Sequence, residues 1–207
     1  MKKLLTSIDE LAKSRYKIYL ELLKNELTKE SKIINLGDTN SGIFTQILRE
    51  MGFNVITVDL YDADIKCDLN KNIPFKSKTF DIAIAGEVIE HLYRTRTFLS
   101  ETYRILKPNG IFIISTPNIA CLKNRIKLLF GKLPTYCADA EDFELKHNIP
   151  GHIRDFNLSL LKKLLKETGF KIESVKTNGI FIRMKKIFPS KICPPTLGDI
   201  LILKARK

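Results

Sequence analysis

Hydrophobic and polar positions divide this chain into alternating amphipathic helices and short apolar strands. Apolar residues recur at three- and four-residue spacing through residues 8–28, which predicts an N-terminal helix. Helical periodicity returns after residue 42 and ends near 50, and it recurs over 97–106 and 158–168. The short apolar runs predict strands at 32–36, 54–60, 65–69, 79–87, 111–118, 171–178 and 198–207.

Local end signals support these limits. Gly52 followed by Phe53, and Gly169 followed by Phe170, are typical of helix C-termini, where glycine takes the left-handed conformation. Asn157 is a typical N-cap for the helix that follows it. Strands alternating with helices predict a doubly wound, mostly parallel α/β sheet. Such sheets bind ligands beyond the carboxyl ends of their strands, so residues at those ends form the candidate site.

Composition limits the class of protein. A length of 207 residues with 44% hydrophobic residues predicts one globular domain over 1–207. The N-terminus begins like a signal peptide, but Asp9 and Glu10 interrupt its apolar stretch, so we expect a cytoplasmic protein. The four cysteines form no CxxC pair and the three histidines have no ligand spacing with them, so we expect no metal site. The net charge of +12 favours anionic partners: nucleic acid, a phosphorylated substrate or an acidic membrane surface.

The turn after the first strand, GDTNSG at 37–42, has the position of a nucleotide-binding turn. It lacks the GxGxxG pattern of dinucleotide sites and the lysine of a P-loop, so the turn alone is weak evidence. Asp59 ends the second strand about 20 residues further on, where a carboxylate can accept both hydroxyls of a ribose. Asp68 ends the third strand and offers a second acceptor, suited to an exocyclic amine.

Five motifs occur in order over most of the chain: IINLGDTNSGIFTQIL, VITVDL, CDLNKNIPFKSKTFDIAIAGEVIEHL, RILKPNGIFIISTPN and HIRDFNLSLLKKLLKETGF. The third and fourth are the most specific. With them the chain resembles the class I S-adenosylmethionine-dependent methyltransferases, in the branch that acts on small molecules and lipids, and is similar to ubiquinone-type O-methyltransferases. The resemblance implies a Rossmann-like seven-stranded sheet with an antiparallel last strand. It also implies an enzyme that uses S-adenosyl-L-methionine.

On the methionine side of the cofactor, the resemblance places Gly37 and its turn around the amino-acid part, and the Gly86–Glu87 backbone near the sulfonium. The family usually has an acid where Asn35 stands, and a shorter turn with an inner glycine. Asp38 and Asn40 tolerate left-handed backbone better than most residues, so we expect them to keep the turn tight. Cofactor binding is therefore expected, at an affinity below the family norm.

On the adenosine side, the resemblance implies that Asp59 binds the ribose and that Leu60 or Tyr61 lies against the adenine. Asp68 and the backbone amide of Leu69 would then read the edge of the adenine ring. All these residues stand at or just after predicted strand ends.

Candidate general bases lie further along the chain. A base matters most for a hydroxyl acceptor, whereas carbon and phenolate acceptors need one less. His91 and His152 are the first candidates; the alternatives are a packed histidine at 91 and a capping and ion-pair cluster around 152. Glu87 ends a central strand, but it could be only a polar wall of the methionine pocket. Glu90 is a further candidate, although we expect it to be a solvated charge or a charge at the start of a helix.

Two segments combine positive charge with apolar residues. Lys123, Arg125 and Lys127 interleave with leucine and isoleucine within 119–132, and residues 180–192 have a similar composition. An interfacial helix has this pattern, and so does a lid helix with a solvated lysine face. We expect residues 119–150 to form an acceptor-side lid. The two basic segments are expected to contact an anionic acceptor or the inner membrane surface.

The sequence thus predicts a methyltransferase that acts on a hydroxyl of a small or lipid-linked acceptor. Two alternatives stay open. A nucleic-acid methyltransferase would use the +12 charge, although the sequence shows no aromatic set for base stacking. A non-catalytic member would keep the fold as a binding subunit. The sequence does not predict the oligomeric state.

Overall fold

A seven-stranded sheet forms the centre of the computed structural model, which describes residues 9–39, 41–135, 151–182 and 185–207. Its strands are β1 (Lys32–Leu36), β2 (Asn54–Asp59), β3 (Ile65–Lys66), β4 (Phe80–Gly86), β5 (Leu106–Pro117), β6 (Lys171–Thr177) and β9 (Ile200–Arg206). Their order is β3-β2-β1-β4-β5-β9-β6. Only β9 runs antiparallel to its neighbours in this sheet, and the other neighbouring strands pair in parallel. The predicted sheet, with its antiparallel last strand, is confirmed.

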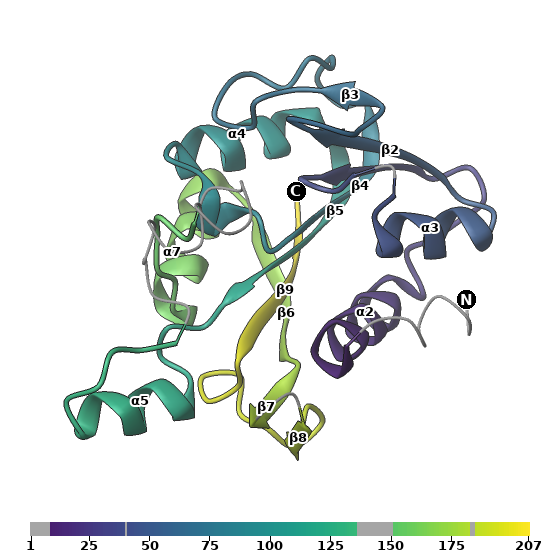
Figure 1. Cartoon of the computed structure of the whole chain (residues 1–207). Helices are drawn as coiled ribbons and strands as arrows, with labels where there is room; N and C mark the ends of the chain where they lie inside the picture. Colours follow the sequence, from purple (N-terminus) through teal and green to yellow (C-terminus); the bar gives the residue numbers. More distant parts are fainter. Residues whose placement is uncertain (1–8, 40, 136–150, 183–184) are drawn as a thin grey trace.

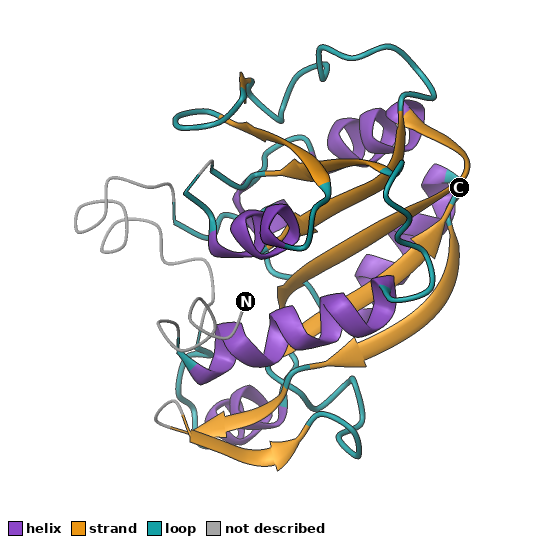
Figure 2. Ribbon diagram, turned by 90° about the vertical axis from the view of Figure 1, so that its right-hand side faces the viewer, coloured by secondary structure: helices purple, strands orange, loops and turns teal. Residues whose placement is uncertain are grey.

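Helices cover both faces of the sheet (Figures 1 and 2). They are α2 (Glu10–Leu23), α3 (Ile43–Glu50), α4 (Thr95–Ile105) and α7 (Leu158–Thr168). On one face, Phe44 of α3 joins a buried cluster with Ile33 of β1. On the other face, Phe98 of α4 and Leu161 of α7 join a second cluster with Ile34. Successive side chains of β1 point to opposite faces of the sheet and so enter two separate cores. Each fully buried side chain contributes about 1.5–3 kcal/mol to the stability of the fold.

The predicted helix ends form as expected. The side chain of Asn157 accepts a hydrogen bond from the backbone N–H of Leu160 at 2.9 Å, which caps α7. Gly169 ends the same helix with a φ of 107°, and Gly52 follows α3 with a φ of 87°. These caps fix where the chain turns back into the next strand, and so they position the strand ends.

Three segments differ from the sequence prediction. The N-terminal helix covers Glu10–Leu23 within the described residues, and the chain after it forms turns instead of continuing to residue 28. Residues 107–110, which read as a turn, belong to β5, with Asn109 at a φ of 62°. The basic segment 180–192 contains a hairpin of β7 (Gly179–Ile182) and β8 (Lys185–Pro189), which forms a separate two-stranded sheet.

Helix α5 (Leu122–Leu129) lies at the end of the molecule where β5 stops and β9 begins, and so does the β7–β8 hairpin (Figure 1). The backbone N–H of Leu122 donates to the carbonyl of Leu197, just before β9. Within the described part of the chain, no helix has both the length and the apolar character needed to cross a bilayer.

Candidate active site

The candidate site lies at the carboxyl ends of β1 and β4, where the strand order reverses. A cavity of about 40 Å³ remains at this corner. It is lined by side chains from α2, the turn after β1, α3 and the end of β4: Arg15, Tyr16, Tyr19, Asn35, Gly37, Asp38, Phe44, Ile84 and Gly86. The structure thus brings together Asn35, Gly37, Asp38 and Gly86, four of the residues predicted to contact the cofactor.

Two glycines let backbone segments approach each other closely here. Gly37 has a φ of 76°, and a Cβ atom at this position would lie 2.2 Å from a methyl carbon of Val88. A Cβ atom on Gly86 would lie 2.7 Å from the hydroxyl oxygen of Tyr19. The corner therefore requires glycine at both positions, and it exposes backbone where a ligand would bind.

Asp38 supplies the acid that is missing at position 35. The side-chain amide of Asn35 donates to Oδ2 of Asp38 at 2.7 Å, and the hydroxyl of Thr45 donates to the same oxygen at 2.7 Å. Burial raises the pKa of Asp38, and the hydrogen bond from Thr45 opposes this rise. Asp38 therefore places a carboxylate beside position 35, where the family usually has an acid, from a position three residues later in the turn.

These side-chain contacts, not a left-handed backbone at Asp38, hold the turn. Among the described non-glycine residues, positive φ values occur only at Lys78, Glu87 and Asn109, so the predicted reason for the tight turn is wrong at Asp38. Oδ1 of Asp38 instead accepts the backbone N–H of Thr39 at 3.0 Å, which closes the turn locally. Asn40 lies outside the described residues, so its role stays a prediction.

The predicted ribose acceptor stands at the end of β2. Oδ1 of Asp59 accepts the backbone N–H of Tyr61 at 3.0 Å, which orients the carboxylate. The side chains of Leu60 and Tyr61 are 50% and 60% exposed, unusually open for large apolar residues, and they offer the surface that an adenine ring would cover.

Asp68 lies beyond β3, which pairs with β2 beside Asp59. A hydrogen bond from the backbone N–H of Asn70 holds the pKa of Asp68 below its usual range. The carboxyl is therefore ionised at neutral pH and ready to accept a hydrogen bond. Leu69 is buried in the core, which fixes the backbone of this segment.

The sequence prediction missed the contribution of α2. Arg15 forms an ion pair with Glu87 at 3.3 Å, and Tyr19 shares a hydrogen bond with the hydroxyl of Ser115 at 2.5 Å. Burial raises the pKa of Tyr19, so its phenol stays neutral. One signal was present: Arg15 stands four residues after Leu11 and four before Tyr19, and so interrupts the apolar stripe of the helix with a charge.

Glu87 links α2 to the central strands. Its φ of 59° is left-handed, so the chain reverses direction sharply after β4. The hydroxyl of Ser115 donates to Oε1 of Glu87 at 2.6 Å, while Oε2 faces Arg15. The prediction that Glu87 lies at this corner agrees with its position, and these contacts give the carboxylate a fixed direction.

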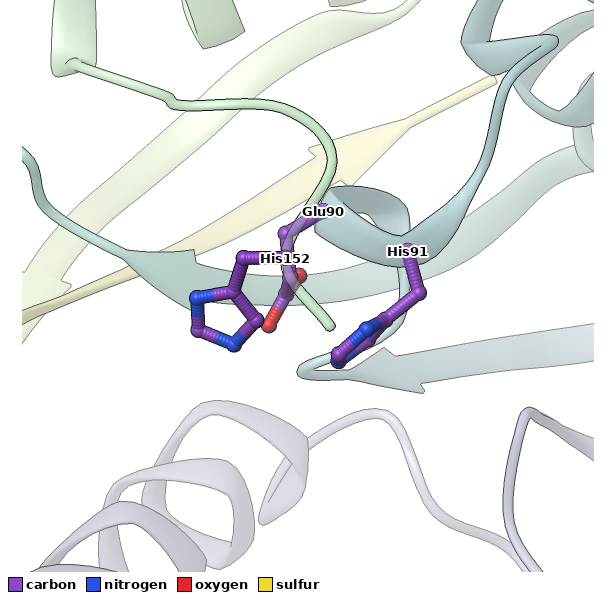
Figure 3. Close-up of side chains that lie close together, drawn as sticks. All are labelled: Glu90, His91 and His152. Atoms are coloured by element: carbon purple, nitrogen blue, oxygen red, sulfur yellow. The ribbon is translucent and has the colours of Figure 1, made fainter. Parts of the chain in front are cut away.

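A second group of side chains lies beside this corner. Glu90 and His91 come from the short helix η1 (Ile89–His91), and His152 comes from the loop before α7 (Figure 3). The rings of His91 and His152 lie 4.9 Å apart, and one ligand atom from each of the three residues falls within 4.8 Å of the others. We refer to Glu90, His91 and His152 as the acid–histidine cluster.

Glu90 is the buried member of this cluster. It lies at the start of η1, which agrees with the helix-start alternative, whereas the alternative of a solvated charge is wrong. Glu90 is only 1% exposed, because the turn after Glu87 directs its side chain inward. Oε2 accepts a hydrogen bond from the hydroxyl of Thr116 at 2.9 Å, while Oε1 has no hydrogen-bond partner among the described residues. Burial raises the pKa of Glu90 well above its usual range, and the nearby charge of Glu87 adds to this effect.

Backbone contacts hold His152 against η1. The N–H groups of Ile153 and Arg154 both donate to the carbonyl of Glu90, at 3.0 and 3.1 Å. The guanidinium of Arg154 donates to the carbonyl oxygens of Leu92 and Tyr93. A segment about 60 residues further along the chain is thereby locked onto the turn after β4, which explains how two distant histidines meet.

The cluster can serve two kinds of chemistry. A histidine beside a buried acid is suited to accepting a proton. The same oxygen and nitrogen atoms could hold a divalent cation, which the sequence analysis did not anticipate because it tested only cysteine-based patterns. Nδ1 of His91 lies 3.2 Å from the carbonyl oxygen of Gly151, so a proton on Nδ1 would leave the lone pair on Nε2.

Two other regions contribute less to the site. Part of the predicted lid, residues 136–150, lies outside the described residues, so the lid stays a prediction. A larger cavity, about 390 Å³, lies at the opposite end of the strands, among residues such as Ser31 and Asp81 that precede or begin strands. Ligands of doubly wound sheets bind at the carboxyl ends instead, so we assign the site to the smaller cavity.

The charges at the corner match those of an amino acid. Nε of Arg15 is buried without a hydrogen-bond partner among the described residues, and Asp38 and Glu87 provide carboxylates nearby. The methionine part of S-adenosylmethionine carries both an ammonium and a carboxylate, so these residues fit the cofactor. A cavity of about 40 Å³ has room for a few water molecules at most, so side chains such as Arg15 must shift when the cofactor binds.

The strand order and the switch-point corner are those of a doubly wound sheet with its site beyond the carboxyl ends of β1 and β4. Comparison with known families shows which family has this fold. Residues 9–175 match the model of the methyltransferase domain family, and the chain belongs to this family.

Among curated proteins, the chain is 33% identical over 118 residues to a probable S-adenosylmethionine-dependent methyltransferase of Mycolicibacterium smegmatis, covering 57% of this chain and 38% of that protein. It is 32% identical over 127 residues to the ubiquinone biosynthesis O-methyltransferase of Rickettsia typhi, covering 54% and 49%. The human mitochondrial enzyme of the same name is 29% identical over 121 residues, covering 49% and 32%. The match thus spans less than half the length of each relative.

Solved structures show the same fold. A methyltransferase of Archaeoglobus fulgidus aligns with a TM-score of 0.63 and 18% identity, covering 92% of each chain. A [4+2]-cyclase aligns with a TM-score of 0.64 and 14% identity, covering 95% of this chain and 82% of that one. Because a cyclase shares the fold, the fold alone does not define the reaction, and the site must carry that argument.

Proposed function

We propose that this chain transfers the methyl group of S-adenosylmethionine to a hydroxyl oxygen of a small or lipid-linked acceptor. The observation that carries the proposal is the acid–histidine cluster, which lies immediately after the Gly86–Glu87 corner. A hydroxyl must lose a proton as it gains a methyl group, whereas a neutral amine has a lone pair before it reacts. A proton acceptor beside the methyl donor is therefore what O-methylation requires.

When bound, the cofactor would supply an activated methyl group for the hydroxyl oxygen of the acceptor. The proton that this hydroxyl loses would pass to an imidazole nitrogen of His91 or His152. Asp59 and Asp68 would hold the adenosine part, and the Arg15–Glu87 pair would border the methionine part. General base catalysis of this kind is worth about 10²–10⁴-fold in rate.

The curated relatives support an oxygen acceptor. Proteins named ubiquinone biosynthesis O-methyltransferase match this chain in several organisms, at 26–32% identity. Their name describes their own reaction, and each is matched over less than half its length. We therefore extend only the class of acceptor, a hydroxyl on a small or lipid-linked molecule, to this chain.

Methyl-labelled cofactor with a panel of phenols, catechols and a lipid extract tests the proposal. Mass spectrometry identifies the labelled product and the atom that carries the methyl group. We expect O-methylated product, a loss of about 10²-fold or more in His91→Asn or His152→Asn, and unchanged binding of S-adenosylhomocysteine in both variants. Label on nitrogen or carbon, or full activity in both variants, would contradict the proposal.

A further inference from the structure

Helix α5 differs from an ordinary surface helix, because its buried residue is polar and its large apolar side chains are exposed. Its only buried residue is Asn124, whose side chain exchanges two hydrogen bonds with the backbone of Thr135, at 2.8 and 3.1 Å. Lys123 forms an ion pair with the buried carboxylate of Asp199 at 2.9 Å. The Lys123–Asp199 pair thus attaches α5 to the residue before β9, and Asn124 holds the segment after α5 against the helix. The large apolar side chains of α5 are exposed.

The outward side of α5 and of the segment after it is strongly apolar. Leu129 is 80% exposed, Phe130 is 72% exposed and Leu133 is 78% exposed. The β7–β8 hairpin at the same end of the molecule exposes Ile182 and Ile187 to more than half of their surface. Monomeric proteins rarely leave such a group of large apolar side chains open to water unless it contacts something.

The charge of this region is entirely positive. Residues 121–135 and 179–198 contain no aspartate or glutamate. Lys132, Lys185 and Lys191 are exposed at its surface, between the apolar side chains. A cationic surface with apolar side chains standing out of it is complementary to anionic lipid headgroups above a hydrocarbon layer.

The surface also lies close to the reaction. α5 follows the carboxyl end of β5 after a short link, in which Asn118 forms a bridge with Phe156. Phe156 stands four residues after His152 of the acid–histidine cluster. Figure 1 shows α5 and the hairpin as separate elements at the same end of the molecule, where the parallel strand β5 stops.

We propose that α5 with residues 130–133 and the β7–β8 hairpin with the residues that follow it to 192 form a docking surface for an anionic lipid bilayer. We call this region the basic–apolar surface. It would hold the acceptor side of the enzyme against the membrane, so that a lipid-linked acceptor could reach the cluster without leaving the bilayer. The docking stands on this surface alone, and its link to the acceptor rests on the proposed function.

The structure corrects which cations carry the attraction. The sequence predicted Lys123, Arg125 and Lys127, but Lys123 pairs with Asp199 and Lys127 donates to the hydroxyl of Thr135 at 2.7 Å. Arg125 donates to backbone carbonyls of residues 120 and 196. Lys123 and Arg125 thus hold α5 against the chain before β9, and Lys127 holds the segment after α5, so a test of docking should change the exposed lysines instead.

Flotation with vesicles of phosphatidylcholine, with or without phosphatidylglycerol, tests the proposal. The parent should bind the anionic vesicles at low salt and bind the neutral ones much more weakly. Changing Lys132, Lys185 and Lys191 to glutamine should weaken binding about a hundredfold, because each charge near an acidic bilayer contributes close to a factor of five. Changing Leu129 and Phe130 to aspartate should abolish it.

Variants of exposed residues outside the basic–apolar surface serve as matched controls. Met51 is an exposed apolar residue after α3, so Met51→Asp should leave binding unchanged. The same holds for Lys24, Lys29 and Lys76 changed to glutamine, because they are exposed lysines away from the surface.

Two results would overturn the proposal. One is a parent that ignores anionic vesicles at low salt. The other is a dimer in solution that dissociates in the Leu129→Asp, Phe130→Asp variant, because the surface would then be a subunit interface. His91→Asn should bind vesicles like the parent, because the docking does not depend on the reaction. If the parent binds anionic vesicles but forms no O-methylated product, the docking stands and the proposed reaction is refuted.

Discussion

Replacing Glu90 with glutamine tests whether this buried carboxyl is protonated in the free protein. Burial and the charge of Glu87 raise the pKa of Glu90 well above that of an ordinary glutamate. Between the ordinary and the raised pKa, the folded chain holds a proton that the unfolded chain has released. The free energy of unfolding therefore falls as pH rises through this window.

The size of the effect follows from one proton. The stability of the parent should fall by up to about 1.4 kcal/mol per pH unit inside the window, from this group alone. Glutamine resembles the neutral acid and does not titrate. Parent and Glu90→Gln should therefore have similar stability below about pH 4, and the variant should gain on the parent at higher pH.

Urea unfolding followed by circular dichroism at a series of pH values measures this difference. The other carboxyl groups are present in both proteins, so their contributions cancel in the difference of unfolding free energy. Glu101→Gln is the matched control: a hydrogen bond from Arg104 lowers the pKa of Glu101, so that variant should lose stability against the parent as pH rises.

A difference between parent and Glu90→Gln that stays flat with pH would refute the reasoning, because it would mean that folding leaves the pKa of Glu90 unchanged. The same two proteins report on metal binding. A rise in melting temperature with Mg²⁺ that the parent shows and Glu90→Gln lacks would assign the carboxyl to a cation.

Three further predictions concern single residues. Asp59→Ala should weaken S-adenosylhomocysteine binding more than tenfold in calorimetry without changing the melting temperature, because a charged hydrogen bond is worth about 1.5–3 kcal/mol; equal affinity would remove Asp59 from the site. Gly37→Ala should cost more stability in urea than Gly52→Ala, since both have positive φ but only the first Cβ would meet another side chain, and equal costs would contradict the close approach. Asn157→Ala should lower the free energy of unfolding by about 1 kcal/mol, and no change would mean that the cap of α7 is not formed in solution.

The fold could be predicted because its signals are local. Period-two and period-3.6 patterns, with Asn157 and Gly169 as end signals, depend only on neighbouring residues. The hairpin was missed because its strands lack a recognisable turn sequence between them. Residues 107–110 were misread because a proline and a glycine usually end an element, whereas here they enter the edge of a long strand.

The site could be predicted only in part. Parallel strands gather their carboxyl ends at one edge, so residues such as Gly37, Asp59 and Gly86 could be found from their place after a strand. Arg15 could not be found in this way, because it lies on a helix before the first strand; its place in the apolar stripe predicts burial but not which strand ends it faces. Glu90 was misjudged because the left-handed turn at Glu87 reverses which side chains face inward.

The contact between Ser14 and the β7–β8 hairpin has a thermodynamic consequence. Nζ of Lys186 donates to the hydroxyl of Ser14 at 2.7 Å, and that hydroxyl donates to the carbonyl of Asn178 at 3.0 Å. The hairpin is thereby attached to α2, one residue before Arg15 at the cofactor corner. If a bound bilayer repositions the hairpin, it acts on the same helix that must shift for the cofactor. Reciprocity then requires that cofactor binding change the affinity for the bilayer by the same factor.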